Sequence, residues 1–600
     1  FNGQLALNYE IFKGLKARAF FAYDYTNLAQ KEMKTACTFY TYDSVQDTYN
    51  PITKVAKGEL MEKTQPYYKT TQQYSLNYKN TFNDLHDVEA LALWEWKETN
   101  TNWFMARRYY STTSAIPELD RGDVDNMYNE GNSAVYKYGG LVGRLNYVYA
   151  GKYMAEFSFR YDGSYKTAPD KRWGFFPAVS AGWRISEEQF MKDLVPQMDN
   201  LKLRASWGSI GNDSQLNASQ FVSGWQFEDR FILGGAGNSS ASITNGMKEA
   251  NLANPNITWY KVMTTNVGLD GSFWGGKLSF EFDYFYRKTT GYPATRNTSL
   301  PTTSGIPLPQ ENLNSSDNRG FELSLGTVQR IGNVNLQIKG NVAYAREKDL
   351  YKEQALPLNQ YKNWRDNGAY RWKNVTWGYE HIGQFQSYDE IYNSPIQDGK
   401  GNSSLRPGDI KYKDLNGDGL IDANDEKVIG KGTFPDLNFG LTLAADWKGF
   451  DVNILFQGAS NYTQVLNALT SPFRGPGEGN GFRVWMDSWH KADYNDPDSE
   501  WVPGKFPSLR IEGNDNNSKK STYWTTDAYY VRLKSIEIGY TIPKNLLSKV
   551  GIEHLRVYAN AYNPLTITNV KYTDPEAIEG WQSFYYPQLK VYSFGVNVSF

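Results

Sequence analysis

The chain has 600 residues and a formal net charge of −2 at pH 7, which excludes the strongly basic balance typical of nucleic-acid-binding proteins. No apolar run is long enough for a transmembrane helix, which needs about 20 residues. The single cysteine, Cys37, excludes a disulfide framework. Aromatic residues make up 16% of the chain, and this content of Tyr and Trp suits surfaces that are apolar at one end and wet at the other.

Seventeen segments alternate apolar and polar residues with period two, the pattern of a strand that presents one apolar face. In chain order, the predicted strands cover residues 5–11, 15–25, a segment ending at 82, 88–96, 141–149, 153–161, 179–185, 201–207, 262–273, 278–286, 321–328, 334–338, 437–445, 452–456, 530–540, 555–562 and 592–600.

Two kinds of connection alternate along the chain. Tight turns are predicted at Asn83–Asp84 and Gly275–Gly276, among others. Long polar loops are predicted at 26–72 and 100–137, and the longest covers 347–435. Short turns at one end and long loops at the other are typical of transmembrane β-barrels.

These patterns predict an all-β fold, a transmembrane antiparallel β-barrel with long external loops. Strands of about ten residues match a tilted bilayer crossing. A closed barrel is also the β architecture that satisfies every backbone group in lipid. Bacterial single-chain barrels have even strand numbers, so seventeen predicts that an odd number of N-terminal strands is missing. Residues 1–600 are then the C-terminal part of a larger barrel.

The hairpin between Phe157 and Glu188 predicts the two faces of this barrel. Its loop is expected at Asp162–Lys171, on the outer side. One face is aromatic and aliphatic, and the other carries Arg, Ser and Gly without a second hydrophobic layer. The residues expected to face lipid are Phe157, Phe159, Val179 and Trp183, and those expected to face the lumen are Ser158, Arg160, Ser180 and Arg184.

A twelve-residue segment at 414–425, inside the longest loop, has the spacing of an EF-hand calcium loop. Oxygen side chains occupy positions 1, 3, 5, 9 and 12, with Gly419 at the sharp turn. Asp425 stands where Glu is usual, which predicts weaker or rearranged coordination. The alternative is a polar turn without an ion. The predicted calcium ligands are Asp414, Asn416, Asp418, Leu420 through its carbonyl, Asp422 and Asp425.

No catalytic constellation emerges from the sequence. The four histidines are scattered, and neither HExxH nor GxSxG occurs. Tryptophans in the long loops are predicted mainly to pack the loops together, the alternatives being sugar stacking or contact with a lid protein. These loop tryptophans are Trp225, Trp364, Trp372, Trp377, Trp485, Trp489 and Trp524.

Blocks of sequence resemble the SusC/RagA-type TonB-dependent outer-membrane transporters in order along nearly the whole chain. The blocks are RYDGS (160–164), RWGFFPAVSAGWRISEEQF (172–190), LKLRASWGSIGN (201–212), NPNITW (254–259), DYFYRKT (283–289), NRGFELSL (318–325), DLNGDGLIDANDEKVIG (414–430), YVRLKSIEIGYTIP (530–543), DPE (574–576) and YYPQLKVYSFGVNVSF (585–600).

This resemblance implies a 22-stranded barrel in the bacterial outer membrane, of which about 17 strands are present here, together with an N-terminal plug and a TonB box that this chain lacks. It implies import of a large nutrient, an oligosaccharide in the first place and a peptide as the alternative. A SusD-like surface lipoprotein and TonB are the implied partners, with outer-membrane lipids around the barrel. Since the chain begins at Phe1 without Met or a signal peptide, we interpret it as a mature or truncated product.

Two other classes of function stay open at this point. One is a barrel that serves as a structural scaffold in a surface complex without importing anything. The other is a secreted glycan-active β enzyme, because paired carboxylates cannot be recognised in a single sequence rich in Asp and Glu. The prediction is nevertheless a transport component rather than an enzyme.

Overall fold

The computed structural model describes residues 1–600 apart from 56, 111–115, 126, 219, 234–241, 297–307, 356, 358, 471–480, 511–514, 548–550, 578–585 and 587. It divides into two compact units. Unit 1 comprises Phe1–Ala181, Trp207–Val262 and Leu300–Asn312, and unit 2 comprises the rest. Among the described residues, no helix combines the length and apolarity needed to cross a membrane.

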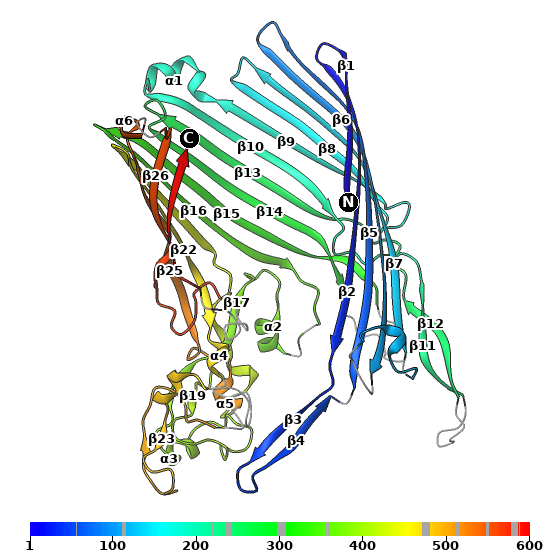
Figure 1. Ribbon diagram of the computed structural model, residues 1–600, viewed down its shortest axis with the longest axis vertical. Coiled ribbons are helices and arrows are strands. Elements are labelled where there is room, and N and C mark those ends of the chain that lie inside the picture. Colours follow the sequence, from blue (N-terminus) through cyan, green and yellow to red (C-terminus); the bar gives the residue numbers. More distant parts are fainter. Residues whose placement is uncertain are drawn as a thin grey trace. The chain divides into compact units, whose positions relative to one another are not determined.

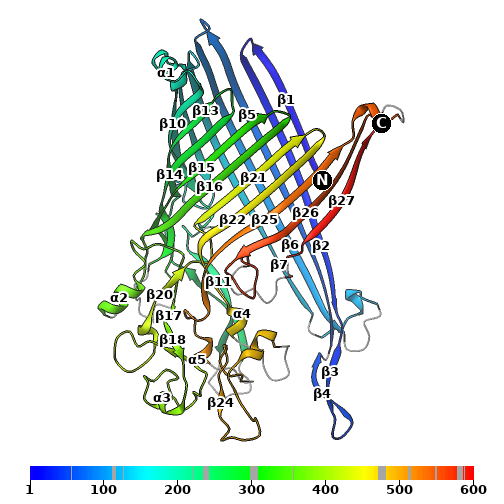
Figure 2. The same cartoon turned by 90° about the vertical axis from the view of Figure 1, so that its left-hand side faces the viewer.

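Seventeen strands of the described chain form one antiparallel sheet in which each strand pairs with the next along the chain, and the predicted fold and strand number are confirmed. Within unit 2, β14, β15 and β16 run side by side in Figures 1 and 2. The seventeen strands are β1 (Asn2–Phe12), β2 (Leu15–Lys34), β5 (Gly58–Phe82), β6 (His86–Tyr110), β7 (Tyr128–Tyr149), β8 (Tyr153–Ser164), β9 (Trp173–Arg184), β10 (Met198–Asn212), β13 (Tyr260–Phe273), β14 (Leu278–Thr295), β15 (Gln310–Ile331), β16 (Val334–Tyr351), β21 (Leu437–Trp447), β22 (Phe450–Val465), β25 (Thr525–Thr541), β26 (His554–Thr568) and β27 (Val591–Ser599).

Shorter elements occupy the connections. The two-stranded pairs are β3 (Cys37–Asp43) with β4 (Thr48–Val55), β11 (Gly224–Leu233) with β12 (Ser242–Asn251), β17 (Val375–Tyr379) with β20 (Glu426–Lys431), β18 (His381–Gln384) with β19 (Ile410–Tyr412), and β23 (His490–Lys491) with β24 (Trp501–Val502). The helices are α1 (Gln189–Leu194), α2 (Gln360–Asp366), α3 (Tyr388–Tyr392), α4 (Asn467–Thr470), α5 (Asp515–Ser518) and α6 (Lys544–Leu547), and the 3-10 turns are η1 (Leu119–Arg121), η2 (Ile185–Glu187), η4 (Ala423–Asp425) and η5 (Arg483–Asp487).

The tight turns form as predicted, because their residues tolerate the left-handed backbone. Asn83 and Asp84 both have positive φ, 51° and 56°, as the central residues of a type I′ turn require, and the N–H of Leu85 closes the turn on the carbonyl of Phe82. Gly275 and Gly276 adopt φ of 68° and 78° between β13 and β14. Asp199 accepts hydrogen bonds from both of these glycine N–H groups, at 2.9 and 2.8 Å, and so holds the turn.

The predicted loops at 26–72 and 100–137 are wrong, because strand continues through most of both segments. The β2 and β5 strands have 20 and 25 residues, well beyond the expected ten. The end of β2 and the beginning of β5, which pair with each other, are polar and show no apolar alternation. Strands still form there because the backbone hydrogen bonds of the ladder do not depend on side-chain polarity. Lys31 lies directly opposite Glu62 and forms an ion pair with it at 2.9 Å. Such cross-strand pairs replace apolar contacts there.

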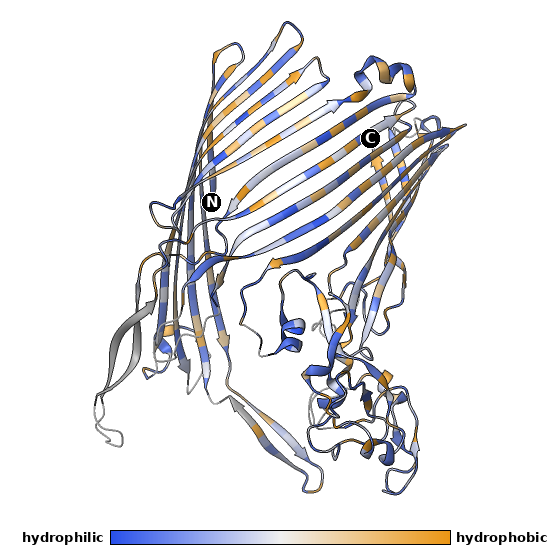
Figure 3. Cartoon of the chain, turned by 180° about the vertical axis from the view of Figure 1, so that it is seen from behind, coloured by the Kyte–Doolittle hydropathy of each residue, from blue (hydrophilic) through white to orange (hydrophobic). Residues whose placement is uncertain are grey.

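The hairpin of β8 and β9 carries its aromatic face as expected. Tyr161 stacks on Trp173 with ring centroids 5.2 Å apart, and Phe159 lies 5.5 Å from Phe175. Phe157 is exposed on the same face. The alternation of apolar and polar residues along the strands is visible in Figure 3. The aromatic side chains of this face are therefore exposed and form an apolar surface on the sheet.

On the opposite face, buried carboxylates of β6 and β8 share an arginine. Arg160 forms a two-pronged ion pair with Asp162, at 2.9 and 3.0 Å, and lies 3.7 Å from Glu95. Gln73 donates to Glu95 at 2.6 Å. Asp162 pairs with Gly140 of β7 in the backbone ladder, so it belongs to β8, which ends at Ser164. The predicted loop of Asp162–Lys171 is therefore displaced to 165–172.

Unit 2 repeats this arrangement on its own strands. Arg204 of β10 forms two-pronged ion pairs with Asp270 and Asp283, at 2.6–3.0 Å, and so connects three consecutive strands. On β21 and β22, Trp447 stacks with Phe450 on the apolar face. Both units thus have one face of apolar side chains and one of paired polar side chains.

The two faces of β7 respond differently to the same substitution. Leu145 is exposed on the apolar face, so Leu145→Arg should prevent assembly, at a cost of about 2–4 kcal/mol if the site lies at the bilayer midplane. Asn146, its neighbour, lies opposite Glu89 and Glu156, so Asn146→Arg should be tolerated. Heat-modifiable gel migration of membrane fractions measures assembly. Equal assembly of both variants, or failure of Asn146→Arg alone, would contradict the assignment of faces.

Candidate functional site

Two long loops of unit 2 fold together around one hydrophobic core. The first, 352–436, connects β16 to β21, and the second, 466–524, connects β22 to β25. The prediction that loop tryptophans pack the loops together is confirmed for Trp485, Trp489 and Trp524. Trp364 is exposed, and the Trp225 side chain lies outside the described residues. The buried core residues are Tyr379, Ile410, Tyr412 and Ile421 from the first loop and Leu469, Trp485, Phe506 and Trp524 from the second.

A buried ion pair also joins the two loops. Asp409 of the first loop is fully buried and forms an ion pair with Arg510 of the second. Asn517 donates to the Asp409 carboxylate at 2.8 Å, and the backbone N–H of Arg406 donates at 3.0 Å. Burial raises the pKa of Asp409, although Arg510 and Asn517 act in the opposite direction. Losing either charge would leave the other unpaired in the loop core.

Asp398 organises the turn before β19. Its carboxylate accepts from the backbone N–H groups of Lys400, Asn402 and Ser404 at 2.7, 2.8 and 2.9 Å. The hydroxyl of Ser404 donates to it at 2.7 Å. Partial burial works to raise the pKa of Asp398, but these hydrogen bonds stabilise the carboxylate and lower its pKa to about 2.

The predicted calcium segment forms the expected tight turn. Asp414 accepts from the N–H groups of Gly417 and Gly419, at 2.6 and 2.9 Å, and both glycines have positive φ. Asp418 accepts from the N–H of Leu420 at 2.8 Å. Asp414, Asn416 and Asp418 follow one another at the two-residue spacing of the first EF-hand ligands, and the turn at Gly417 and Gly419 lies among them.

The second half of the predicted ligand set is engaged elsewhere. Asp425 is fully buried, and its carboxylate accepts from the N–H groups of Leu415 and Asp422 at 2.7 and 2.9 Å. Asp422 caps η4 through the N–H of Asn424. Among the described residues, no three His, Cys, Asp or Glu side chains converge closely enough to hold a metal ion. The oxygen donors suit calcium in kind, and its binding stays a prediction.

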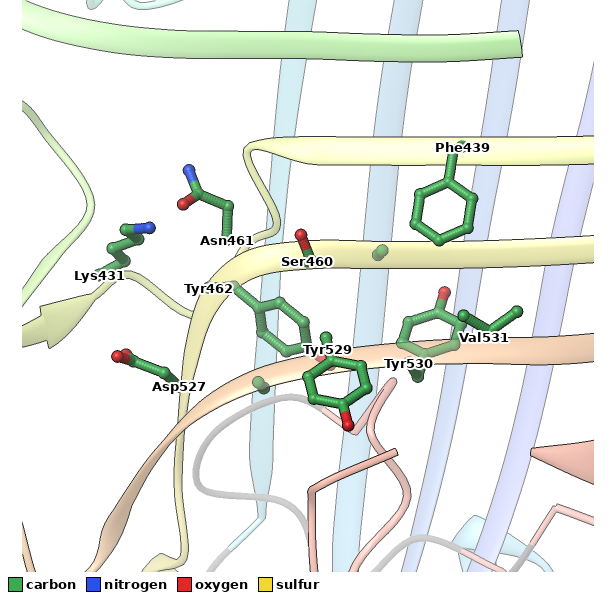
Figure 4. Close-up of a pocket in the computed structure, with 11 residues that line it drawn as sticks. Lys431, Phe439, Ser460, Asn461, Tyr462, Asp527, Tyr529, Tyr530 and Val531 are labelled. Carbon is green, nitrogen blue, oxygen red and sulfur yellow. The ribbon is translucent and has the colours of Figure 1, made fainter. Parts of the chain in front are cut away.

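A pocket of about 460 Å³ lies on unit 2 where β21, β22 and β25 meet the loops (Figure 4). A β-bulge between Ala459 and Tyr462 creates it, because Ser460 and Asn461 together stand opposite Tyr529. A bulge breaks the period of two, so the sequence pattern did not reveal this pocket. The lining residues are Lys431, Phe439, Ala459, Ser460, Asn461, Tyr462, Asp527, Ala528, Tyr529, Tyr530 and Val531.

The reverse face of β25 binds the segment that contains the DPE block. Arg532 is buried, and its guanidinium forms ion pairs with Asp574 and Glu576. Tyr530 donates to Glu576 at 2.9 Å, and Tyr462 donates to the carbonyl of Pro575 at 2.8 Å. The conspicuous block in the sequence is therefore a structural attachment of the connection between β26 and β27.

An antiparallel sheet with an apolar outer surface, paired charges on the reverse face, and long folded loops defines the class of membrane β-barrel proteins. A family model described as TonB dependent receptor-like, beta-barrel, matches residues 2–564. The chain therefore belongs to the TonB-dependent receptor β-barrel family, and the predicted SusC/RagA-type resemblance and outer-membrane localisation are confirmed.

Individual relatives support this assignment. TonB-dependent receptor P3 of Formosa agariphila is 28% identical over 610 residues, covering 97% of this chain and 58% of that protein. TonB-dependent receptor SusC of Bacteroides thetaiotaomicron is 26% identical, covering 76% of this chain and 43% of that protein. The structure of the RagAB peptide transporter superposes with a TM-score of 0.74 at 22% identity, covering 100% of this chain and 61% of that one.

The chain thus spans just over half the length of the first relatives it matches, 58% and 52%. These relatives are named as receptors, and membership in their family excludes the enzyme alternative.

The carboxylate of Asp398 gives a pH-dependent prediction. Because its pKa is lowered from 3.8 to about 2, its stabilising contribution is present above about pH 4 and is lost as the pH falls through about 2. Asp398→Asn should destabilise the turn by about 1 kcal/mol at pH 4. Pepsin cleavage within 396–405, mapped by mass spectrometry, should then be faster in the variant at pH 4, and the difference should vanish near pH 2. A difference that grows towards pH 2 would contradict the role of this carboxylate.

Proposed function

We propose that the complete protein is an outer-membrane importer of a large nutrient, energised through TonB. Membership in the TonB-dependent receptor family carries this proposal. The folded loops add to it, since barrels place their longer loops on the extracellular side, where a ligand arrives. A core of aromatic residues and a buried ion pair give these loops a defined shape rather than a flexible fringe.

We infer that the substrate is an oligosaccharide, with a peptide as the alternative. The SusC relative supports a relation to the SusC branch, and the RagAB structure is that of a peptide transporter. Large aromatic side chains on the loops, including Trp364, Tyr370 and Tyr392, are exposed and suit either ligand. The same surfaces suit a SusD-like lipoprotein that covers the long-loop end, which we propose as the partner.

Deletion of the gene tests the proposal. A deletion strain should fail to grow on one polysaccharide or on one peptide mixture as sole source, and the full-length gene should restore growth. Purification of the tagged protein should recover one surface lipoprotein. Normal growth of the deletion strain on every polymer that the parent strain uses, with the lipoprotein still copurifying, would instead favour a structural scaffold.

We also propose that the segment 414–425 binds calcium and that the ion rigidifies the loop. The side-chain spacing and the turn at Gly417 and Gly419 support this. On binding, Asp414, Asn416, Asp418 and the carbonyl of Leu420 would supply oxygens, with Asp422 and Asp425 exchanging their present hydrogen bonds for coordination. Calcium at about millimolar concentration outside the cell is enough for weak loops of this kind.

Replacing two predicted ligands should remove the ion. The double variant Asp414→Asn with Asp418→Asn should lose about one calcium per chain, measured by elemental mass spectrometry, because two of the four anionic ligands are removed. A matched control, Asp496→Asn with Asp498→Asn, changes two exposed aspartates of the second loop and should retain the ion. Unchanged calcium content in the first double variant would show that the segment is only a polar turn.

A further inference from the structure

The pocket of Figure 4 is lined on the apolar face of unit 2 by Phe439, Tyr529 and Val531, while Tyr462 and Tyr530 line it from the reverse face. Along β25, Val531 and Tyr529 alternate with the buried Tyr530 and Arg532, whose side chains bind the 574–576 segment on the reverse face. In the register of the sheet, Phe439 lies opposite Gly458, Gly458 opposite Val531, and Val531 opposite Ile567. These residues therefore form one row across four strands on the apolar side.

Gly458 makes this row concave. A Cβ atom at this position would come within 2.2 Å of the Phe439 ring and 2.7 Å of the carbonyl oxygen of Tyr530, so only glycine leaves the space. The ring of Phe439 therefore lies over the backbone of β22, and Val531 flanks it. Ile567, the next residue of the row, is exposed. Together these residues form an apolar track that leads away from the pocket.

The opposite rim of the pocket is polar. It lies at the long-loop end of the strands, because β22 enters the second loop after Val465 and β25 leaves it at Thr525. The bulge residues Ser460 and Asn461 stand there with Lys431 and Asp527, and Tyr529 lies between the polar and the apolar parts (Figure 4). A tyrosine in this place is typical of the interface between a bilayer and water.

The charges around this rim select the kind of head group. Lys431 is the cation of the lining and Asp527 its anion. A second carboxylate, Asp436, lies beside them and accepts from the Asn461 amide at 2.8 Å. Arg346 lies 3.6 Å from Asp436, so two carboxylates balance two cations, and the rim carries no net positive charge to attract a phosphate group. An uncharged polyhydroxyl group can instead exchange hydrogen bonds with carboxylate, amide, hydroxyl and ammonium and place a ring face on Tyr529.

We propose that this pocket binds the saccharide head of an outer-leaflet glycolipid, whose acyl chain follows the track of Phe439, Val531 and Ile567. The volume of about 460 Å³ is in the range of small-ligand pockets and suits a sugar unit. The pocket is amphipathic in the direction of the membrane normal, with the polar rim towards the extracellular loops and the apolar track towards the bilayer. The bound lipid fixes the ends of β22 and β25 at the membrane surface.

Binding of n-dodecyl-β-D-maltoside to the full-length protein, held in tetraethylene glycol monooctyl ether, tests this site by native mass spectrometry. The maltoside should bind at least about tenfold more tightly than dodecylphosphocholine and than free maltose. Tyr529→Ala should weaken maltoside binding about tenfold, because the ring between the two parts of the pocket is lost. The matched control Tyr540→Ala, on the same strand and the same face but outside the pocket, should change binding less than twofold.

Two further variants keep the test decisive if Tyr529→Ala does not assemble, as judged by heat-modifiable migration. Tyr529→Phe should bind within about threefold of the wild type, since the ring remains, whereas Asp527→Asn should weaken maltoside binding and strengthen phosphocholine binding. Equal affinity for the two amphiphiles would show nonspecific lipid contact. Equally tight binding of free maltose would identify a soluble saccharide as the ligand. Equal losses in Tyr529→Ala and Tyr540→Ala would place the binding elsewhere. Each of these three results would overturn the proposal.

Discussion

In a hydrocarbon medium, no backbone N–H or C=O group can be left without a partner, and the rest of this structure depends on that constraint. The continuous ladder from β1 to β27 meets it for every strand that has a neighbour on both sides. Because the backbone is satisfied by the ladder, side chains are free to differ between the two faces. The apolar face can then contact lipid, while the other face can hold ion pairs such as those of Arg204 with Asp270 and Asp283.

Outside the bilayer, water can pair with backbone groups, so the loops are stabilised by other contacts. There, short β pairs, a core of aromatic residues and the buried pair of Asp409 with Arg510 give stability without lipid. The pocket lined by Phe439 and Tyr529 lies where the sheet meets the folded loops, so its lining is apolar at one end and polar at the other. The glycolipid proposal follows from this position, while the import proposal follows from the family.

Period-two alternation was sufficient to predict all seventeen strands of the sheet, because each has a lipid-facing half that must be apolar. It failed for the end of β2 and the beginning of β5, where paired residues such as Lys31 and Glu62 are polar. Strands of this kind show no alternation of apolar and polar residues in the sequence. The calcium spacing was visible in the sequence, but the hydrogen bonds of Asp425 to Leu415 and Asp422 were not. The pocket at the bulge could not be found either, because an extra residue shifts the register that the pattern relies on.

One hydrogen bond gives the second loop a mechanical role. The N–H of Leu466, the first residue after β22, donates to the carbonyl of Trp524, the last residue before β25, at 2.8 Å. The loop is thus clamped at its neck, and Trp524 is at the same time part of the loop core. Because Trp524 belongs both to the loop core and to this neck, a displacement of the core is transmitted to the adjoining ends of β22 and β25.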